Sequence, residues 1–320
     1  MKRLLELSLF FVCLSTSIFA GEPTIQTILL WPDTPPGAMA GDTERATRIA
    51  DAIKDGSYQV PQKNRRDIRV PSIDVYLPPK KDANGVAMVI FCGGGYGAVC
   101  IASEGRPMRQ FLNDNGIAVF MVSYRCSPFN HPIPLWDAQR ALRIVRSRAQ
   151  EFGVDANKIG AMGFSAGGHE ASTLSVHYDE PFGYQPIDAI DQVSARPDFS
   201  CLIYPVISMR PAYTHGGSCR NLLGANPSEA LRAKLSNDEQ VDQQTPPAFL
   251  VHGTADNAVK PENSKRYHEA FIKNGVPTKL VLVEGGMHGP AILNGQPAIR
   301  KTKDPYADSM IQWINDLFDQ

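Results

Sequence analysis

Residues 159–172 read IGAMGFSAGGHEAS, a short apolar run that leads into a serine flanked by glycines. Within it, residues 163–167 match the pattern G-x-S-x-G around Ser165. The apolar run predicts a buried strand, and a helix is expected to follow through Ala171 and Leu174. At such a junction the pattern is typical of a nucleophile elbow, where glycines let a serine adopt a strained backbone and expose its hydroxyl. Gly and Ser also abound in loops, so the motif indicates a nucleophile elbow only because a predicted strand precedes it.

Seven apolar runs of similar length are spread along the chain. They cover residues 73–77, 86–92, 117–124, 158–164, 199–205, 247–253 and 278–284. Continuous runs of this kind suit strands that are buried on both faces. Between or after these runs, apolar residues recur at helical intervals and predict three helices. They are expected at residues 135–152, at about 261–273 before Asn274-Gly275, and at the end of the chain after Asp304 as cap and Pro305 as first residue. We therefore predict an α/β fold, with a mostly parallel central sheet and helices on both faces.

The composition argues against polyanionic partners. The 320 residues carry a formal net charge of −1, so nothing attracts the chain electrostatically to nucleic acid or to an acidic membrane surface. A neutral small molecule or a sugar chain is the expected partner. Five cysteines follow the first 20 residues, without CxxC spacing, and three of them adjoin apolar runs, which predicts small buried residues rather than a disulfide framework or a metal site. These five are Cys92, Cys100, Cys126, Cys201 and Cys219.

A serine nucleophile needs an imidazole to accept its proton and a carboxylate to orient that imidazole. Both should follow later strands, in the order Ser, acid, His. Asp256 lies in the loop after residues 247–253, and His288 lies in the glycine-rich loop after residues 278–284. Asp198, which precedes a strand, is the rival acid. The other six histidines are predicted to be surface or packing residues: His131, His169, His177, His215, His252 and His268.

Acyl transfer also needs backbone N–H groups that face the developing oxyanion. The amide of Ala166, directly after the serine, is one expected donor. The run CGGGYG after residues 86–92 is predicted to supply the other, with Gly94 and Gly95 as donors. A plain flexible turn is the alternative for this run. It lacks the pattern of a phosphate-binding loop and the acidic residue of a dinucleotide site.

Several motifs together resemble secreted α/β-hydrolase carbohydrate esterases, the acetylxylan-esterase and feruloyl-esterase-like group. They are CGGGYG, EGRPMRQFLNDNGIAVFMVSYR, PLWDAQRALRIVRSRAQEFGVDANKIGAMGFSAGGH, CLIYPVIS, NLLG, PPAFLVHGTADNAV and VEGGMHG. The resemblance runs from about residue 30 to the end of the chain. It implies the α/β-hydrolase fold, Ser165 as nucleophile, Asp256 as acid, His288 as base and the glycine run as oxyanion hole. Cys92 departs from the Pro or His usual before the glycines, which bears on the shape of that loop.

The predicted function is that of an exported serine esterase that removes short acyl groups, acetyl above all, from sugar hydroxyls of xylan or xylo-oligosaccharides. It requires no metal or cofactor. Tyr96 and Trp136 are candidates for stacking on a sugar ring, with packing as the alternative for each. Other functions to be weighed are a general small-ester carboxylesterase, a peptidase of the dipeptidyl or prolyl type, and a non-catalytic binding protein on a hydrolase-like fold. The peptidase reading would call for a large additional domain, which 320 residues do not accommodate.

The first 20 residues contain two basic residues, an apolar run and a small residue before Gly21. This is the layout of a cleavable export signal, and the run is short for a membrane anchor. We predict a signal peptide at residues 1–20, an extended arm at 21–70 and an α/β-hydrolase catalytic domain at 71–320. The mature protein is then secreted or periplasmic.

Overall fold

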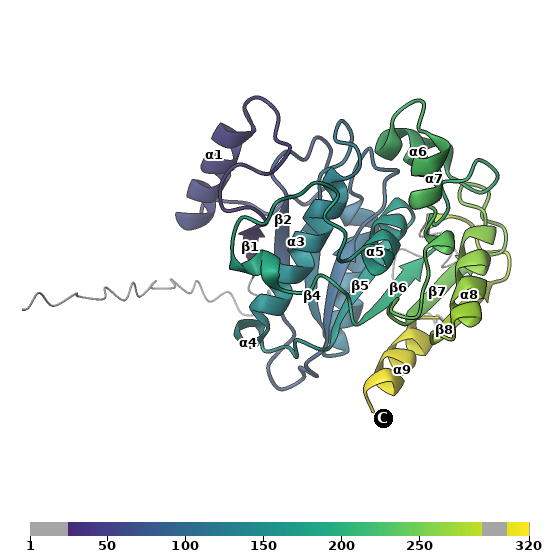
Figure 1. The fold of residues 1–320 in the computed structure, drawn as a ribbon. Helices are drawn as coiled ribbons and strands as arrows, with labels where there is room; N and C mark the ends of the chain where they lie inside the picture. Colours follow the sequence, from purple (N-terminus) through teal and green to yellow (C-terminus); the bar gives the residue numbers. More distant parts are fainter. Residues whose placement is uncertain (1–24, 290–305, 320) are drawn as a thin grey trace, which may run out of the picture.

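The computed structural model describes residues 25–289 and 306–319, and its ribbon is drawn in Figure 1. The strands in this part of the chain form one sheet of eight. They are β1 (Ile25–Leu29), β2 (Ser72–Tyr76), β3 (Ala87–Phe91), β4 (Ala118–Ser123), β5 (Ile159–Phe164), β6 (Phe199–Ile203), β7 (Ala248–Gly253) and β8 (Thr278–Val283).

The strand order in the sheet is β1-β2-β4-β3-β5-β6-β7-β8. The pairs β1·β2 and β2·β4 are antiparallel, and the strands from β4 to β8 are parallel. All seven strands predicted from the apolar runs are present, within a residue or two of their expected ends. The predicted α/β-hydrolase fold, with its mostly parallel sheet and flanking helices, is confirmed.

Helices cover the sheet and connect its strands. They are α1 (Asp42–Lys54), α2 (Arg106–Asp114), α3 (Ile133–Ser147), α4 (Ala149–Phe152), α5 (Ala166–Val176), α6 (Gly216–Leu223), α7 (Glu229–Lys234), α8 (Glu262–Asn274) and α9 (Ala307–Phe318), with the 3₁₀ turns η2 (Ala189–Gln192) and η3 (Asn237–Glu239) and the π-helical turn η1 (Ile101–Gly105). The helix expected over residues 135–152 is divided at Arg148, whose φ of −111° leaves the helical region. Asp304 and Pro305, expected to begin the last helix, lie outside the described residues.

The prediction of an extended arm at residues 21–70 is wrong for two segments of it. Residues 25–29 form β1, which belongs to the sheet, and Thr27 Oγ1 donates to Asp74 Oδ1 of β2 at 2.8 Å. Residues 42–54 form α1, whose buried residues are Asp42 and Ala46 alone. The apolar residues of β1 do not alternate, and α1 buries no apolar stripe, so neither segment carries the periodicity that would have revealed it.

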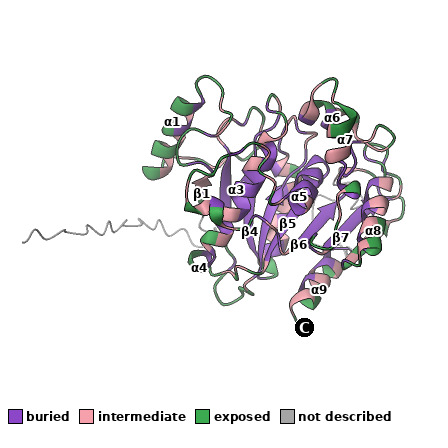
Figure 2. Ribbon diagram, in the orientation of Figure 1, coloured by how far each residue is buried: buried purple, intermediate pink, exposed green. Residues whose placement is uncertain are grey.

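Strands β2 to β7 form the buried centre of the molecule, the edge strands β1 and β8 are partly exposed, and the outer helices expose one face to solvent (Figure 2). Helix α5 packs against β3, β5 and β6. Helix α9 packs through Trp313 against Phe199 and Phe249, with ring centroids 6.3 and 5.7 Å apart. No helix within residues 25–289 or 306–319 is long and apolar enough to cross a membrane.

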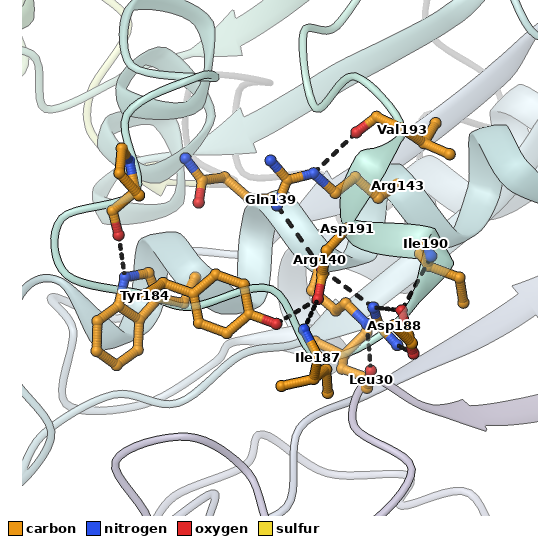
Figure 3. A network of polar contacts seen from close by, with 12 residues as sticks. Leu30, Gln139, Arg140, Arg143, Tyr184, Ile187, Asp188, Ile190, Asp191 and Val193 are labelled. Carbon is orange, nitrogen blue, oxygen red and sulfur yellow. Dashed lines mark hydrogen bonds and ion pairs between the residues drawn. The ribbon is translucent and has the colours of Figure 1, made fainter.

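A buried ionic network joins the end of β1 to α3 and η2 (Figure 3). Arg140 Nε donates to Leu30 O at 2.9 Å, and its terminal nitrogens contact Asp188 at 2.5 Å and Asp191 at 3.0 Å. Tyr184 donates its hydroxyl proton to Asp191. The side chains of Arg140 and Asp191 are 2% and 0% exposed, so the network fixes the N-terminal segment to the domain from inside.

Because β3 to β8 run parallel in the sheet, the loops that follow β3, β5, β6, β7 and β8 all emerge at one edge. In open α/β sheets, sites form outside this carboxyl edge. The glycine run, Ser165, Asp256 and His288 all follow one of these strands. The strand order alone therefore places the predicted residues at the same edge of the sheet.

Candidate active site

Ser165 occupies a sharp turn between β5 and α5. Its φ and ψ angles are 52° and −119°, in the positive-φ region that residues other than glycine rarely adopt. The flanking glycines allow this turn: a Cβ on Gly163 would lie 2.1 Å from Gly167 O, and a Cβ on Gly167 would lie 2.1 Å from Phe91 O. The sequence pattern thus corresponds to a close approach of three backbone segments.

The strained backbone of Ser165 is held by its neighbours. Ser165 N donates to Ile203 O at 3.1 Å, and Ser165 O accepts from Val206 N at 2.9 Å. The residue is 7% exposed. The backbone of Ser165 is therefore fixed, and the residue keeps a small exposed surface.

His288 lies between Ser165 and Asp256. The His288 Nε2 atom is 2.9 Å from Ser165 Oγ, and His288 Nδ1 is 2.7 Å from Asp256 Oδ2. A carboxylate only accepts hydrogen bonds, so Nδ1 carries the proton and Nε2 is free to accept the proton of the serine hydroxyl. The three residues predicted from the sequence are brought together in one line of hydrogen bonds.

Asp256 is buried, with 4% of its surface exposed, and fully hydrogen-bonded. Its Oδ1 accepts from the backbone N–H groups of Ala258 and Val259 at 2.9 and 2.8 Å. Burial works to raise the pKa of Asp256, but hydrogen bonds from His252, His288 and Val259 outweigh it and hold that pKa well below its usual range. Asp256 is therefore ionised and fixed in place to orient His288.

The rival acid, Asp198, lies elsewhere. It precedes β6, and its Oδ2 accepts from Ile159 N at 2.8 Å and from Arg146 at 2.9 Å. Ile159 begins β5, so Asp198 lies at the amino edge of the sheet, opposite the loop of Ser165. It is a structural residue that ties an arginine of α3 to the start of two strands.

The glycine loop after β3 contacts the serine turn directly. A Cβ on Gly93 would lie 2.9 Å from Ser165 Cβ, and Gly94 and Gly95 have φ angles of 128° and 63°. Gly93 N–H is occupied by the Glu104 carboxylate, at 2.6 Å. The N–H groups of Gly94 and Gly95 have no acceptor among the described residues, and the first N–H of a helix, here that of Ala166, has none within the helix. These are the three predicted oxyanion donors.

Tyr96, predicted as a sugar-stacking residue, cannot have that role. It is 0% exposed, and its hydroxyl lies 2.9 Å from both His169 Nδ1 and Glu170 Oε2 of α5. Its φ of 57° continues the left-handed path of the glycine run, which turns the ring inward and away from solvent. Tyr96 anchors the glycine loop to the helix that follows Ser165.

Trp136 packs at the start of α3. Its indole Nε1 donates to Pro181 O at 2.9 Å, and its ring lies 5.9 Å from that of Tyr184. The residue is half-buried. A stacking role for Trp136 stays a prediction.

The cysteines after residue 20 are all unpaired. Cys92, which precedes the glycines, is 0% exposed, and a Cβ on Gly105 would lie 2.8 Å from its Sγ. The thiol therefore points into the core beneath η1, and burial raises its pKa well above the ordinary value. Cys92 shapes the glycine loop by packing and presents no nucleophile to the site.

Three residues near the site were not predicted from the sequence. Glu104 contacts the glycine loop, and Tyr204 packs its ring against that of His288 with centroids 4.8 Å apart. His215, assigned to surface or packing, lies on the other side of the loop, 3.8 Å from the Cβ position of Gly95. Burial and then the nearby His288 lower the pKa of His215 below its ordinary value. In the sequence, only their position after a strand of the parallel sheet indicates that these three residues lie near the site.

The arrangement supplies what nucleophilic acyl transfer needs: a base-activated hydroxyl, an oriented imidazole and free backbone donors. No group of three or more His, Cys, Asp or Glu side chains in the described part of the chain is placed to hold a metal ion. The prediction that no cofactor is required stays a prediction.

The amino-acid sequence is similar to those of a xylanase and an acetylxylan esterase. Endo-1,4-beta-xylanase B of Butyrivibrio fibrisolvens is 34% identical over 231 residues, which cover 71% of this chain and 36% of the xylanase. An acetylxylan esterase of Xylanibacter ruminicola is 34% identical over 218 residues, which cover 67% of this chain and 42% of that protein. The chain thus spans 36% and 42% of the length of these two curated relatives.

Two solved structures are also similar to this protein. An acetyl ester-xyloside bifunctional hydrolase from Caldicellulosiruptor lactoaceticus superposes with a TM-score of 0.70 at 35% identity, covering 78% of this chain and 89% of that one. A truncated carbohydrate esterase from gut microbiota, 23% identical with a TM-score of 0.64, shares the fold.

The BD-FAE family matches residues 73–271, which is more than half of the chain and includes the glycine loop, Ser165 and Asp256. The resemblance to carbohydrate esterases seen in the sequence motifs is confirmed by this match and by the relatives above. The protein therefore belongs to the BD-FAE family and has the α/β-hydrolase fold.

Proposed function

We propose that the protein is an exported serine esterase that removes short acyl groups, acetyl above all, from sugar hydroxyls of xylan or xylo-oligosaccharides. The observation that carries the proposal is the line from Asp256 Oδ2 through His288 to Ser165 Oγ, with separations of 2.7 and 2.9 Å. Its nucleophile lies beside three backbone N–H groups without acceptors of their own in the described chain.

In the first half of the reaction, Ser165 Oγ attacks the ester carbonyl carbon while His288 Nε2 takes the hydroxyl proton. The carbonyl oxygen becomes negative and accepts hydrogen bonds from the Ala166 amide and from Gly94 or Gly95. Asp256 stabilises the imidazolium through Nδ1–H. His288 then gives its proton to the departing sugar oxygen, which leaves an acetyl group on Ser165.

In the second half, His288 removes a proton from water, and the resulting hydroxide attacks the acyl carbonyl. The same amides stabilise the second oxyanion. Collapse of the tetrahedral intermediate releases acetate and returns the proton to Ser165.

The choice of substrate is supported by the relatives. One is named an acetylxylan esterase, and a solved relative at 35% identity is described as acting on acetyl esters and xylosides. Export is proposed from residues 1–20, which lie outside the described structure. N-terminal sequencing of the protein recovered outside the cytoplasm should begin near Gly21, and recovery of the full chain inside the cells would refute export.

The proposal is tested by acetate release from acetylated xylan, compared with p-nitrophenyl acetate and feruloylated sugars. We expect release from acetylated xylan and its loss by several orders of magnitude in Ser165→Ala. Fluorophosphonate labelling should depend on Ser165. Turnover of the aryl ester alone would indicate a general small-ester hydrolase, and activity that survives Ser165→Ala would remove the serine mechanism.

A further inference from the structure

Glu104 is a carboxyl group beside the site that the mechanism above does not use. It lies on η1, the π-helical turn that connects the glycine loop to α2. Single π-helical turns are rare and occur frequently at functional sites. One backbone bond joins the segment before this turn to the loop, since Cys100 N donates to Gly93 O at 2.9 Å. A second, local bond places Glu104 relative to that segment, since Glu104 N donates to Cys100 O at 3.1 Å.

The first contact of Glu104 fixes the start of the glycine loop. Its Oε2 accepts the Gly93 N–H at 2.6 Å. Gly93 itself is in close contact with the serine turn, since a Cβ there would lie 2.7 Å from Phe164 O and 2.9 Å from Ser165 Cβ. Because Gly93 is thereby oriented toward η1, the carboxylate sets the path along which Gly94 and Gly95 present their amides.

The second contact reaches toward the base. Glu104 Oε1 accepts the hydroxyl of Tyr204 at 3.3 Å. The Tyr204 ring packs edge-on against His288, with centroids 4.8 Å apart and planes at 62°. Tyr204 has a φ of 39°, and its N–H donates to Val251 O at 2.7 Å. One carboxyl group therefore connects the oxyanion side of the site to the imidazole side.

In the described part of the chain, Glu104 has no Lys or Arg beside it to compensate its charge. Within residues 25–289 and 306–319, no Lys or Arg forms an ion pair with it. The titratable groups that face it are those of His288, Tyr204, Tyr124, Cys92 and Cys100. Burial raises the pKa of Glu104 to about 7, against the opposing effects of Gly93 N–H and His288. A group kept in an environment this unfavourable to its charge is a candidate for a role in the site.

We propose that Glu104 is a positioning residue, which aligns the oxyanion amides through Gly93 and supports His288 through Tyr204. The inference rests on the proposed esterase function. Since the oxyanion forms only in the transition state, loss of the alignment should lower kcat and leave KM nearly unchanged.

The test uses the full chain and p-nitrophenyl acetate, with three variants. Glu104→Ala removes both contacts, and we expect kcat to fall about tenfold to a hundredfold, with KM within about twofold. Glu104→Gln keeps an acceptor for Gly93 N–H, so it should restore most of that loss. Glu44→Ala removes an exposed acid of α1 and serves as the matched control with unchanged kcat. The rate of fluorophosphonate labelling should fall in parallel with kcat in Glu104→Ala.

The outcomes separate this inference from the proposed function. Wild-type kcat in a folded Glu104→Ala variant overturns the positioning role, provided that Ser165→Ala is inactive. A fall in kcat that comes with a large loss of melting temperature, and that Glu104→Gln does not restore, assigns Glu104 a structural role and also overturns it. An inactive wild type, or an active Ser165→Ala, refutes the esterase function instead.

Discussion

His288 Nε2 lies 2.9 Å from Ser165 Oγ, although 123 positions separate the two residues in the chain. Two loops at the carboxyl edge of a parallel sheet bring them together, one after β5 and one after β8. Asp256, after β7, completes the line from the far side of the imidazole. Substitutions of Asp256 and of the rival acid Asp198 should therefore have different effects on activity.

Asp256→Asn should lower kcat on p-nitrophenyl acetate by about four orders of magnitude, because an amide no longer holds the proton on His288 Nδ1. The rival acid provides the matched control. Asp198→Asn removes a charge that contacts Ile159 and Arg146 at the amino edge, so kcat should stay within about twofold of wild type while the melting temperature falls. A comparable loss of kcat in both variants would contradict the assignment.

Gly167→Ala should destabilise the fold. The added Cβ would lie 2.1 Å from Phe91 O, so the serine turn and β3 must move apart. We expect the melting temperature to drop by at least about 5 °C. Gly216→Ala, where nothing lies within 4 Å of the added Cβ, is the control and should change it by less than about 2 °C. Equal melting temperatures for the two variants would show that the close approach at Gly167 is not required.

The contribution of Glu104 to the stability of the fold should decrease as pH rises from about 4.5 to about 7. Burial raises the pKa of this group to about 7 in the folded state, so the folded chain retains a proton that the unfolded chain has released. The contribution is present below the unfolded pKa and is lost as pH rises through the folded one. Burial lowers the pKa of His131 and His169 to about 4, so these two residues act in the opposite direction over the same range.

Glu104→Gln cannot titrate at this position and keeps both histidines, so wild type should lose stability relative to this variant between pH 5 and pH 8, as measured by urea unfolding. The same difference in both proteins would mean that Glu104 is ionised at both pH values.

Arg140→Met should cost about 3 to 5 kcal/mol in the free energy of unfolding, because it removes the nearer cationic partner of the buried Asp191 carboxylate and leaves Arg143, 3.8 Å away, as its remaining ion pair in the described chain. Arg148→Ala removes a surface pair with Glu151 and should cost less than about 1 kcal/mol. Denaturant unfolding measures both. Since Arg140 connects β1 to α3 rather than touching the site, activity per folded molecule should be unchanged in either variant. A small cost for Arg140→Met would mean that the network is hydrated.

The sequence was most informative where strands are buried on both faces. Six of the seven strands predicted from apolar runs, β2 to β7, are buried along their whole length, and β8 is partly buried. The residues after these strands identify Ser165, Asp256 and His288 as a set. What it could not reveal are elements without a periodic apolar face. The five residues of β1 form an edge strand beside β2 in the described sheet, and α1 is largely exposed, so the sequence predicts neither element.

The direction in which a side chain points could also not be predicted from the sequence. Tyr96 follows a glycine run and is aromatic, which suggested a sugar contact, yet its backbone turns the ring into the core, where it bonds to His169 and Glu170. Glu104 gave no signal because its function depends on a turn type that no residue pattern specifies. Both depend on tertiary contacts with α5 or the glycine loop, which become visible only once the chain is folded.

The number of residues in the π-helical turn at 101–105 sets the direction of the Glu104 side chain. Such a turn contains one residue more than an α-helical turn, and each residue of an α-helix advances the side chain by about 100°. Deleting Ser103 would restore ordinary helical register and rotate the Glu104 carboxyl away from Gly93 N–H. Every amino acid around the nucleophile would be retained, yet the loop beside it would lose its anchor.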